Sequence, residues 1–399
     1  MAGVVGTLSR AAPAVASAVR VYLVTPGGES GRGGMGRSAR YLAREWRARG
    51  HGGLEVVDSY GPGVRALMPA YFATALLRVA TAAALGRADL LHVNMAERGS
   101  VLRKGLVVWL GVAFGVPVLV HCHGADFADW HRALGPARRR LVVATLRRAE
   151  RVVVLGRHWR AFVVGELGLT ADRVEVLPNA APEPEPAGAA APPGDAVDGR
   201  PVRLLFLGRL GDRKGVPELL RALADPSVRG LGWAAVLAGD GEVDRFRAEI
   251  EVLGLEDRVR VAGWVGEDEA RRLLAASDVL VLPSRNEGLP VAVLEAMAHG
   301  LAGVATPVGA IPDAVVDGDT GLLVPPGDVR ALAGALARVI ADPALRRALG
   351  GRARTRFEAG FSLRAHADGL ARIYAAVLAG HAGARGQCAT VRRNAPAGR

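Results

Sequence analysis

Short apolar runs alternate with longer amphipathic stretches along the whole chain. In the first half such runs lie at residues 20–25, 89–94, 116–121, 151–155 and 173–178. In the second half they lie at residues 202–207, 233–238, 258–263 and 279–282. Brief apolar runs bounded by turn-forming residues are typical of strands buried on both faces of a parallel sheet. The pattern therefore predicts an α/β chain in which the second half repeats the organisation of the first.

The first run leads into a glycine-rich stretch. Residues 20–25 read as a strand, 26–36 as a loop and 37–49 as a basic helix, which is the opening of a Rossmann-like domain. A loose Gly-x-Gly pattern in the loop, with Glu55 and Asp58 further on, leaves a dinucleotide-binding domain open as an alternative.

Domain boundaries follow from length and composition. A chain of 399 residues exceeds the size at which one core keeps growing, and 181–200 holds prolines among alanines, glycines and acids. We expect a flexible leader at 1–19, a domain at 20–182, a linker at 183–200, a second domain at 201–362, a helix at 363–380 and a disordered basic tail at 381–399.

The richest motif runs from Pro283 to Gly300, directly after the apolar run at 279–282. Pro290 suits the first position of a helix and Gly300 its end. The N–H groups of residues 288, 289 and 291 then lie at a positive helix terminus, where a diphosphate binds well. Glu287 in the loop and Glu295 in the second helical turn are placed to accept hydrogen bonds from sugar hydroxyls.

Two cations follow the run at 202–207. Arg209 and Lys214 lie in a loop at the carboxyl end of the predicted strand, where open α/β sheets bind ligands. A guanidinium fork and an ammonium there can neutralise a diphosphate without a metal ion. A solvated basic turn is the alternative for this loop taken alone.

These motifs resemble a known family. Glu287 and Glu295, spaced by seven residues within Pro-Ser-x-x-Glu-Gly-Leu-Pro, resemble the Glu-x7-Glu motif of the retaining family 4 glycosyltransferases, and 208–215 resembles their phosphate-binding loop. The resemblance implies the GT-B fold, with two Rossmann-like domains facing each other across a cleft and residues 363–380 returning to the first domain. It also implies transfer with retention of configuration and without a metal ion or other cofactor.

The resemblance further implies a set of site residues. The expected catalytic residues are His123, Arg209, Lys214 and Glu287. The expected donor-binding residues are Gly33, Gly34, Trp264, Val265, Gly288, Leu289, Pro290, Val291 and Glu295. Each has a plainer alternative: His123 could be a histidine satisfied at a strand end, Trp264 could pack in the core, and Gly33 and Gly34 could lie in a linker. The chain departs from the family where Ala302-Gly303 replaces the common Pro-Val.

The sequence offers two possible metal sites, and both are disfavoured. His121 and His123 could share a strand face, but no third ligand follows at a suitable spacing. Asp317-Gly-Asp319 is similar to a metal-binding motif of another glycosyltransferase fold, yet Asp-Gly between apolar runs indicates a turn.

Charge and cysteine content bound the partners and the location. The net charge is +12, and seven arginines against one glutamate lie between Arg132 and Arg151. Nucleic acid is disfavoured because no aromatic side chains are interleaved with these arginines. An anionic membrane surface and a solvated basic helix remain equal alternatives, and an apolar helix at 67–85 is open to a peripheral role. Two distant cysteines and no convincing membrane span predict a cytoplasmic protein, peripheral on the inner face of the membrane if the patch binds lipid.

Together these features predict a glycosyltransferase that moves a sugar from a nucleotide-sugar to a glycan or lipid-linked acceptor. An epimerase or phosphorylase of the same fold is one alternative. A dinucleotide-dependent oxidoreductase, or a non-catalytic protein with tandem Rossmann domains, is another. The sugar, the base and the acceptor are not specified by the sequence.

Overall fold

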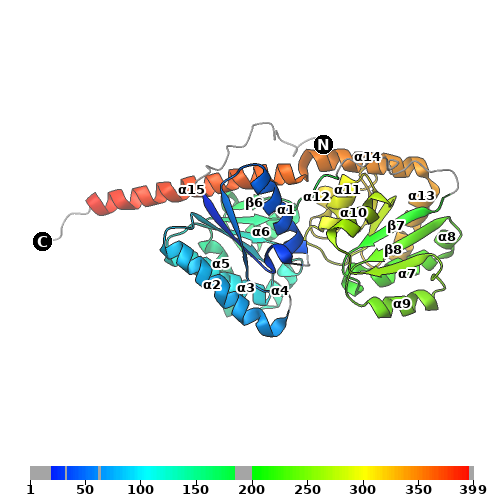
Figure 1. Cartoon of the computed structure of the whole chain (residues 1–399), viewed down its shortest axis with the longest axis horizontal. Coiled ribbons are helices and arrows are strands. Elements are labelled where there is room, and N and C mark those ends of the chain that lie inside the picture. The colour runs from blue at the N-terminus through cyan, green and yellow to red at the C-terminus, as the bar shows by residue number, and fades with distance from the viewer. Residues whose placement is uncertain (1–18, 32–33, 62–63, 185–199, 395–399) are drawn as a thin grey trace. The chain divides into compact units, whose positions relative to one another are not determined.

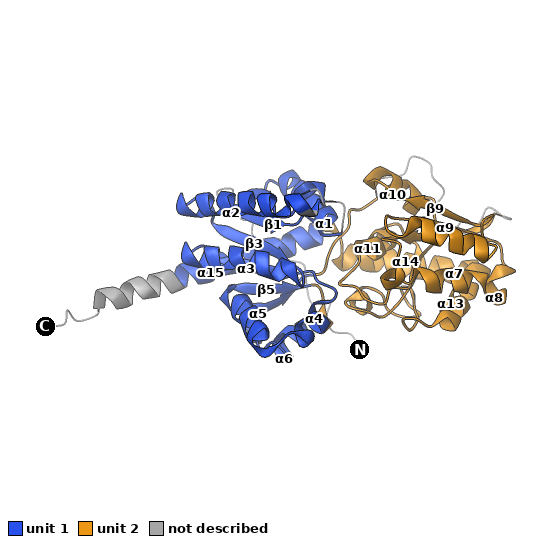
Figure 2. Cartoon of the chain, turned by 90° about the horizontal axis from the view of Figure 1, so that it is seen from below, with its two compact units in different colours: residues 1–154, 160–177, 364–399 blue, residues 155–159, 178–363 orange. Residues whose placement is uncertain are grey.

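The structure is a computed structural model that describes residues 19–31, 34–61, 64–184 and 200–394. The chain forms two compact units (Figure 2). Unit 1 comprises Met1–Val154, Arg160–Leu177 and Arg364–Arg399, and unit 2 comprises Leu155–Trp159 and Pro178–Leu363. After the short segment Leu155–Trp159, the chain passes into unit 2 again at Pro178, earlier than the boundary predicted at residue 182. Most of the predicted leader and linker lies outside the described residues.

Unit 1 is built on a six-stranded parallel sheet of order β2-β1-β3-β4-β5-β6. Its strands are β1 (Arg20–Thr25), β2 (Gly53–Asp58), β3 (Leu90–Met95), β4 (Val118–Cys122), β5 (Arg151–Val154) and β6 (Val174–Val176). Its helices are α1 (Gly34–Ala48), α2 (Met68–Ala84), α3 (Gly99–Ala113), α4 (Phe127–Ala133), α5 (Pro136–Arg148), α6 (Arg157–Gly165, whose first residues belong to unit 2) and α15 (Leu363–Asn394).

The helices of unit 1 cover its sheet on both faces (Figure 1). On one face α1 and α15 close a core in which Trp46, Leu370 and Tyr374 pack on strand residues such as Leu23 and Leu119. Tyr374 Oη also lies 2.6 Å from Nδ1 of the buried His92. On the other face α2, α3 and α5 lie side by side. The last helix of the chain therefore completes the core of unit 1.

The carboxyl-terminal tail differs from its prediction. Residues 381–394 continue α15 as a helix, where the sequence predicted disorder after Gly380. A helix that has already formed adds one hydrogen bond for each further residue, so α15 extends beyond the part that packs on the sheet. Residues 395–399 lie outside the described residues.

Unit 2 contains a second six-stranded parallel sheet, of order β12-β11-β10-β7-β8-β9. Its strands are β7 (Val202–Leu207), β8 (Trp233–Ala238), β9 (Val259–Gly263), β10 (Val279–Leu282), β11 (Ala302–Ala305) and β12 (Leu322–Leu323). Its helices are α7 (Val216–Ala224), α8 (Pro226–Arg229), α9 (Val243–Val252), α10 (Glu267–Ala275), α11 (Val291–Ala298), α12 (Ile311–Ala314), α13 (Val329–Ala341) and α14 (Pro343–Gly360). Short 3-10 turns at Gly28–Ser30, Arg65–Leu67, Ala171–Arg173 and Asp212–Lys214 complete the chain.

The strand order of unit 2 reverses between β7 and β10. The strands on either side of this switch point send their following loops in opposite directions, which leaves a crevice at the carboxyl edge of the sheet. The loop with Lys214 follows β7, and the loop with Glu287 follows β10. The two motifs predicted from sequence thus flank the position where this fold binds ligands.

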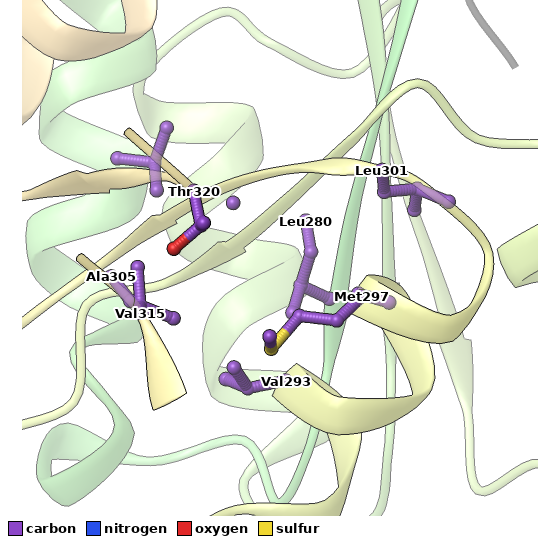
Figure 3. A pocket seen from close by; sticks show the side chains of 10 residues that line it. Leu280, Val293, Met297, Leu301, Ala305, Val315 and Thr320 are labelled. Carbon is purple, nitrogen blue, oxygen red and sulfur yellow. The ribbon is translucent and has the colours of Figure 1, made fainter. Parts of the chain in front are cut away.

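A small apolar cavity of about 10 Å³ lies behind α11 (Figure 3). Leu280, Val293, Met297 and Gly303 are among its lining residues, and Thr320 is the polar one. A cavity of this size holds at most one water, which needs several polar partners. It is therefore a packing defect behind the site and no ligand pocket.

Candidate active site

Lys214 and Glu287 meet at the carboxyl edge of the unit 2 sheet. Lys214 Nζ donates to Glu287 Oε1, and the side chains are only 13% and 6% exposed. Ser284 Oγ donates to the same carboxylate oxygen at 2.7 Å. An ammonium carries three donors, so Lys214 retains N–H groups for a second anion while it holds Glu287.

Backbone contacts hold the two loops against each other. The N–H of Arg285 donates to the Arg213 carbonyl at 2.9 Å, and Arg213 Nη1 donates to the Asn286 carbonyl at 2.9 Å. Gly215 has a φ of 71°, and a Cβ there would lie 2.0 Å from the Pro283 carbonyl oxygen. The backbone at Gly215 thus packs directly against Pro283, which places Lys214 next to Glu287. Only glycine permits this close approach.

Residues that follow a third strand, β11, hold the loop that carries Glu287. The N–H of Ala310 donates to the Gly288 carbonyl at 2.8 Å. Gly309 has a φ of 58°, and a Cβ there would lie 1.9 Å from the Glu287 carbonyl oxygen. Thr306, which follows β11, donates through Oγ1 to the Ser284 carbonyl at 2.5 Å. The Glu287 loop is therefore fixed from both sides.

Helix α11 begins where the sequence predicted, within one residue. Pro290 is its N-cap, with an extended backbone, and Val291 is the first helical residue. The difference is small because a residue with a fixed φ and no N–H fits either position. Gly288, Leu289 and Val291 lie at the positive end of this eight-residue helix, beside the Lys214–Glu287 pair.

Two further predicted residues lie on the same unit. Glu295 is in the second turn of α11 and is only 5% exposed. Trp264 and Val265 directly follow β9, and the Trp264 side chain is 53% exposed. The alternative that Trp264 packs in the core is therefore wrong.

Arg209 is not paired with the Lys214–Glu287 site. Its side chain is 66% exposed, and Nη1 lies 3.2 Å from Oδ2 of Asp240, a residue of the loop after β8. Both loops follow strands next to each other in the sheet. Arg209 is thus at the predicted edge but contacts a different carboxylate.

His123 lies in unit 1, after β4. Its Nε2 lies 3.2 Å from Asn94 Oδ1, while Asn94 Nδ2 donates to Thr25 Oγ1 at 3.2 Å. The Asn94 amide therefore bridges His123 and Thr25 and holds the imidazole ring in place. Burial, and then the nearby His366, lower the pKa of His123 to about 3, so its ring is neutral.

The glycine pair of the first loop is only partly described. Gly33 lies outside the described residues. Gly34 is the first residue of α1, and a Cβ added to it would meet no atom within 4 Å. The sequence predicted that the helix starts at residue 37, whereas the structure starts it at Gly34.

Three residues around the site have roles that the sequence did not predict. Ser284 is fully buried against Glu287, and Asn94 orients His123. Asn179 Nδ2 donates to the Leu289 carbonyl at 2.7 Å, so it holds the loop before α11. Ser284 belongs to the motif Pro-Ser-x-x-Glu, and its position three residues before Glu287 was a usable signal. Asn94 and Asn179 act across long sequence separations, which no local pattern shows.

Within the described residues, no group of three His, Cys, Asp or Glu side chains is placed to hold a metal ion. Burial, and then neighbouring imidazoles, lower the pKa of His121. Asp317 accepts from the Leu323 N–H at 2.8 Å, and Asp319 lies 2.8 Å from Arg352 Nε. The two aspartates of the rejected motif thus have structural partners. In the same described ranges, no helix is long and apolar enough to cross a membrane.

The sequence is similar to known transferases. Residues 33–180 match the model of a glycosyl transferase 4-like domain, and residues 201–342 match that of the glycosyl transferases group 1. An α-D-kanosaminyltransferase of Streptomyces kanamyceticus is 31% identical over 276 residues, which cover 65% of this chain and 70% of the relative. A lipopolysaccharide core mannosyltransferase of Rhizobium leguminosarum is 36% identical over 199 residues, covering 47% of this chain and 55% of the relative.

A solved structure shares the fold. The Anabaena HepE protein, in complex with UDP, has a TM-score of 0.70 and 20% sequence identity, and the match covers 90% of this chain and 100% of that one. With two doubly wound parallel sheets in two units, the chain has the predicted α/β GT-B fold. The matches support none of the epimerase, phosphorylase and oxidoreductase alternatives. The chain belongs to the group 1 glycosyl transferases.

Proposed function

We propose that the protein transfers a sugar from a nucleoside diphosphate sugar, with retention of configuration and without a metal ion. The observation that carries this proposal is the Lys214–Glu287 pair beside the positive end of α11. Breaking a sugar–diphosphate bond develops negative charge on the leaving oxygen, so fixed cationic donors at that oxygen lower the barrier. Lys214 supplies such donors within the protein itself.

The shared contact gives each residue a role. Glu287 accepts hydrogen bonds from sugar hydroxyls, and Lys214 donates to Glu287 and to the leaving phosphate. Because the Lys214 ammonium contacts both Glu287 and the phosphate, it fixes the distance between the sugar that Glu287 binds and the leaving phosphate. Glu295 holds the ribose and Trp264 lies beside the base. Arg209 reaches the diphosphate after its exposed guanidinium leaves Asp240, since an exposed ion pair is weak.

Metal independence rests on the same cations. A divalent ion at a diphosphate neutralises charge, and Lys214, Arg209 and the N-terminal end of α11 offer that charge instead. His123, a neutral ring in unit 1, is proposed to contact the donor sugar. The acceptor then attacks from the face that the phosphate leaves, and the phosphate takes the acceptor's proton.

The class of acceptor is proposed from the relatives. The Rhizobium mannosyltransferase builds lipopolysaccharide core, and the Streptomyces enzyme transfers kanosamine. We propose a glycan or lipid-linked acceptor for this chain. A cytoplasmic location stays a prediction from its two cysteines.

Donor binding is tested by thermal protection with a panel of UDP-, GDP- and ADP-sugars, each with and without EDTA. We expect one nucleotide series to raise the melting temperature equally in both conditions, and NAD to have no effect. The anomeric configuration of the product, measured by NMR, tests retention. Protection that requires a divalent ion, or an inverted product, would overturn the corresponding part of the proposal.

A further inference from the structure

Exposed apolar side chains are concentrated on one part of unit 1. Within the described residues, twelve of the fifteen large apolar side chains that are exposed belong to unit 1, and three belong to unit 2. Most of the twelve lie on or next to α2, α3 and α5. A contiguous exposed apolar patch on a protein marks a surface that something else covers.

Helix α3 shows this most clearly. Val101, Val107 and Val108 are buried toward the sheet, as expected of a helix in this fold. On the opposite side Leu102, Leu106 and Trp109 recur every three to four residues, and they are 66%, 55% and 37% exposed. A helix that is apolar on both sides is usually buried on both. The outer side of α3 lacks such a cover among the described residues.

The neighbouring helices extend the same character. On α2, Leu77 is 68% exposed, and Leu85 at its end is 57% exposed. On α5, Leu141 is 53% exposed and follows three exposed arginines, Arg138 to Arg140. We call the outer sides of these three helices the α2–α3–α5 face.

The charge on this face has one sign. The sequences of α2, α3 and α5 contain no aspartate or glutamate, while α5 carries five arginines. The Arg148 guanidinium lies 4.8 Å from the centre of the Trp109 ring, and Trp109 Nε1 donates to Thr145 Oγ1 at 3.2 Å. Tryptophan at the border between an apolar stripe and basic residues is typical of side chains at the boundary of headgroups and acyl chains.

We propose that the α2–α3–α5 face binds an anionic lipid surface. Leucines of α2 and α3 enter the boundary between headgroups and acyl chains, and arginines of α5 contact lipid phosphates. A second copy of the chain fits this face poorly. A two-fold interface brings the same patch from both copies together, which sets arginine clusters against one another with no acid to offset them. The proposal concerns the surface of unit 1 and does not depend on the reaction in unit 2.

The test uses the full chain and flotation with two kinds of vesicle, one of phosphatidylcholine alone and one containing phosphatidylglycerol. The wild-type protein should float with the anionic vesicles, and salt should weaken that binding. Replacing the α5 arginines by glutamine (Arg138→Gln, Arg139→Gln, Arg140→Gln) should weaken it about 100-fold, since each arginine contributes about 5-fold.

A second variant tests the apolar part. Leu102→Ser with Leu106→Ser should weaken binding about 10-fold or more, and salt should still weaken what remains. Both leucines are more than half exposed, so their replacement leaves the core intact. Retained melting temperature checks this directly.

Matched controls come from unit 2. Val252 on α9 is 85% exposed, and Arg221, Arg330 and Arg338 are exposed on α7 and α13. Val252→Ser, and the three arginines changed to glutamine, alter the same kinds of side chain and the same net charge elsewhere. They should leave vesicle binding within about 2-fold, apart from the weak effect of overall charge.

Several outcomes would overturn the proposal. They are no binding to anionic vesicles, equal binding to both vesicle types, or equal loss in the unit 2 controls. A dimer in light scattering that Leu102→Ser with Leu106→Ser disrupts would also overturn it, because the face would then be covered by a second copy.

Discussion

Units 1 and 2 each contain a parallel six-stranded sheet, yet the helices on their surfaces differ in charge pattern. In unit 2 the helices carry arginines three residues from an acid, as in the Arg245–Glu242, Arg271–Asp268 and Arg272–Glu269 pairs. In unit 1, helices α2, α3 and α5 have no acid at all. The apolar pattern of the strands specifies the sheet in both units, whereas the helix surfaces reflect what each unit contacts.

The buried lysines of the two units also differ: the lysine of unit 2 has an acidic partner, and the lysine of unit 1 has a neutral one. Lys214 of unit 2 is paired with the Glu287 carboxylate. Lys104 of unit 1, on α3, is 1% exposed and donates to the Ser59 hydroxyl. Burial, and then the charge of Arg103, lower the pKa of Lys104 to about 7. One lysine thus forms an ion pair in a site, and the other is a costly group in a core.

The largest effect is expected from Lys214→Ala. Loss of the proposed donor to the leaving phosphate should lower kcat by at least about 10³-fold with the cognate donor. It also leaves Glu287 buried without its cation, so stability should fall. Adding Glu287→Gln should restore stability but no activity. Kinetics and chemical unfolding of the single and double variants measure both effects, and near-normal turnover in Lys214→Ala would contradict the assigned role.

A smaller effect is expected at the glycines after the first strand of each unit. Gly215→Ala should destabilise unit 2 by roughly 2–3 kcal/mol, because φ is positive and the new Cβ meets the Pro283 carbonyl. Gly34→Ala should leave unit 1 unchanged or slightly more stable, since that position is helical and open. Hydrogen exchange of peptides from each unit separates the two results. An equal loss of stability in both variants would show that the close approach at Gly215 is not the cause of the destabilisation.

A pH effect is expected from Lys104. The pKa of Lys104 is about 7 in the folded protein against 10.5 for an ordinary lysine, so the unfolded chain binds more protons between these two pH values. The free energy of unfolding of unit 1 should therefore rise from about pH 7 toward pH 10.5, by about 1 kcal/mol per pH unit. Lys104→Met should remove that slope and stabilise unit 1 near pH 7. Unfolding followed by exchange in α3 measures it, and an unchanged slope in the variant would refute the assignment.

The smallest effect is expected from Gly303→Ala. Gly303 lines the cavity behind α11, its φ is not positive, and a Cβ there meets no atom within 4 Å. The added methyl group should stabilise unit 2 by about 0.5–1 kcal/mol, through the cavity and through the unfolded chain. Thermal unfolding tests it, with Gly34→Ala as the comparison in unit 1. A lower melting temperature would mean that β11 cannot accept a side chain at this position.

The strands and the unit 2 site could be predicted because their signals are local. The apolar runs specify nine of the strands within two residues at either end, and the motif at Pro283–Gly300 placed Glu287 and α11 correctly. The partners of Arg209 and Lys214 could not be predicted, because each depends on which loops the sheet order brings together. The same holds for Asn179, whose contact with Leu289 spans 110 positions. The helical extent of α15 was underestimated, since composition alone says little about where a helix ends.

The packing of α15 on the sheet of unit 1 bears on how the protein is made. Tyr374, Leu370 and Ala367 fill the core over α1, yet the ribosome produces them after every residue of unit 2. Until α15 is synthesised, one face of the first sheet is therefore covered by α1 alone, while the second unit can already fold. Deleting α15 at the carboxyl end would therefore destabilise unit 1, which contains the first residues of the chain. A chaperone that binds nascent apolar surface would be needed most by unit 1.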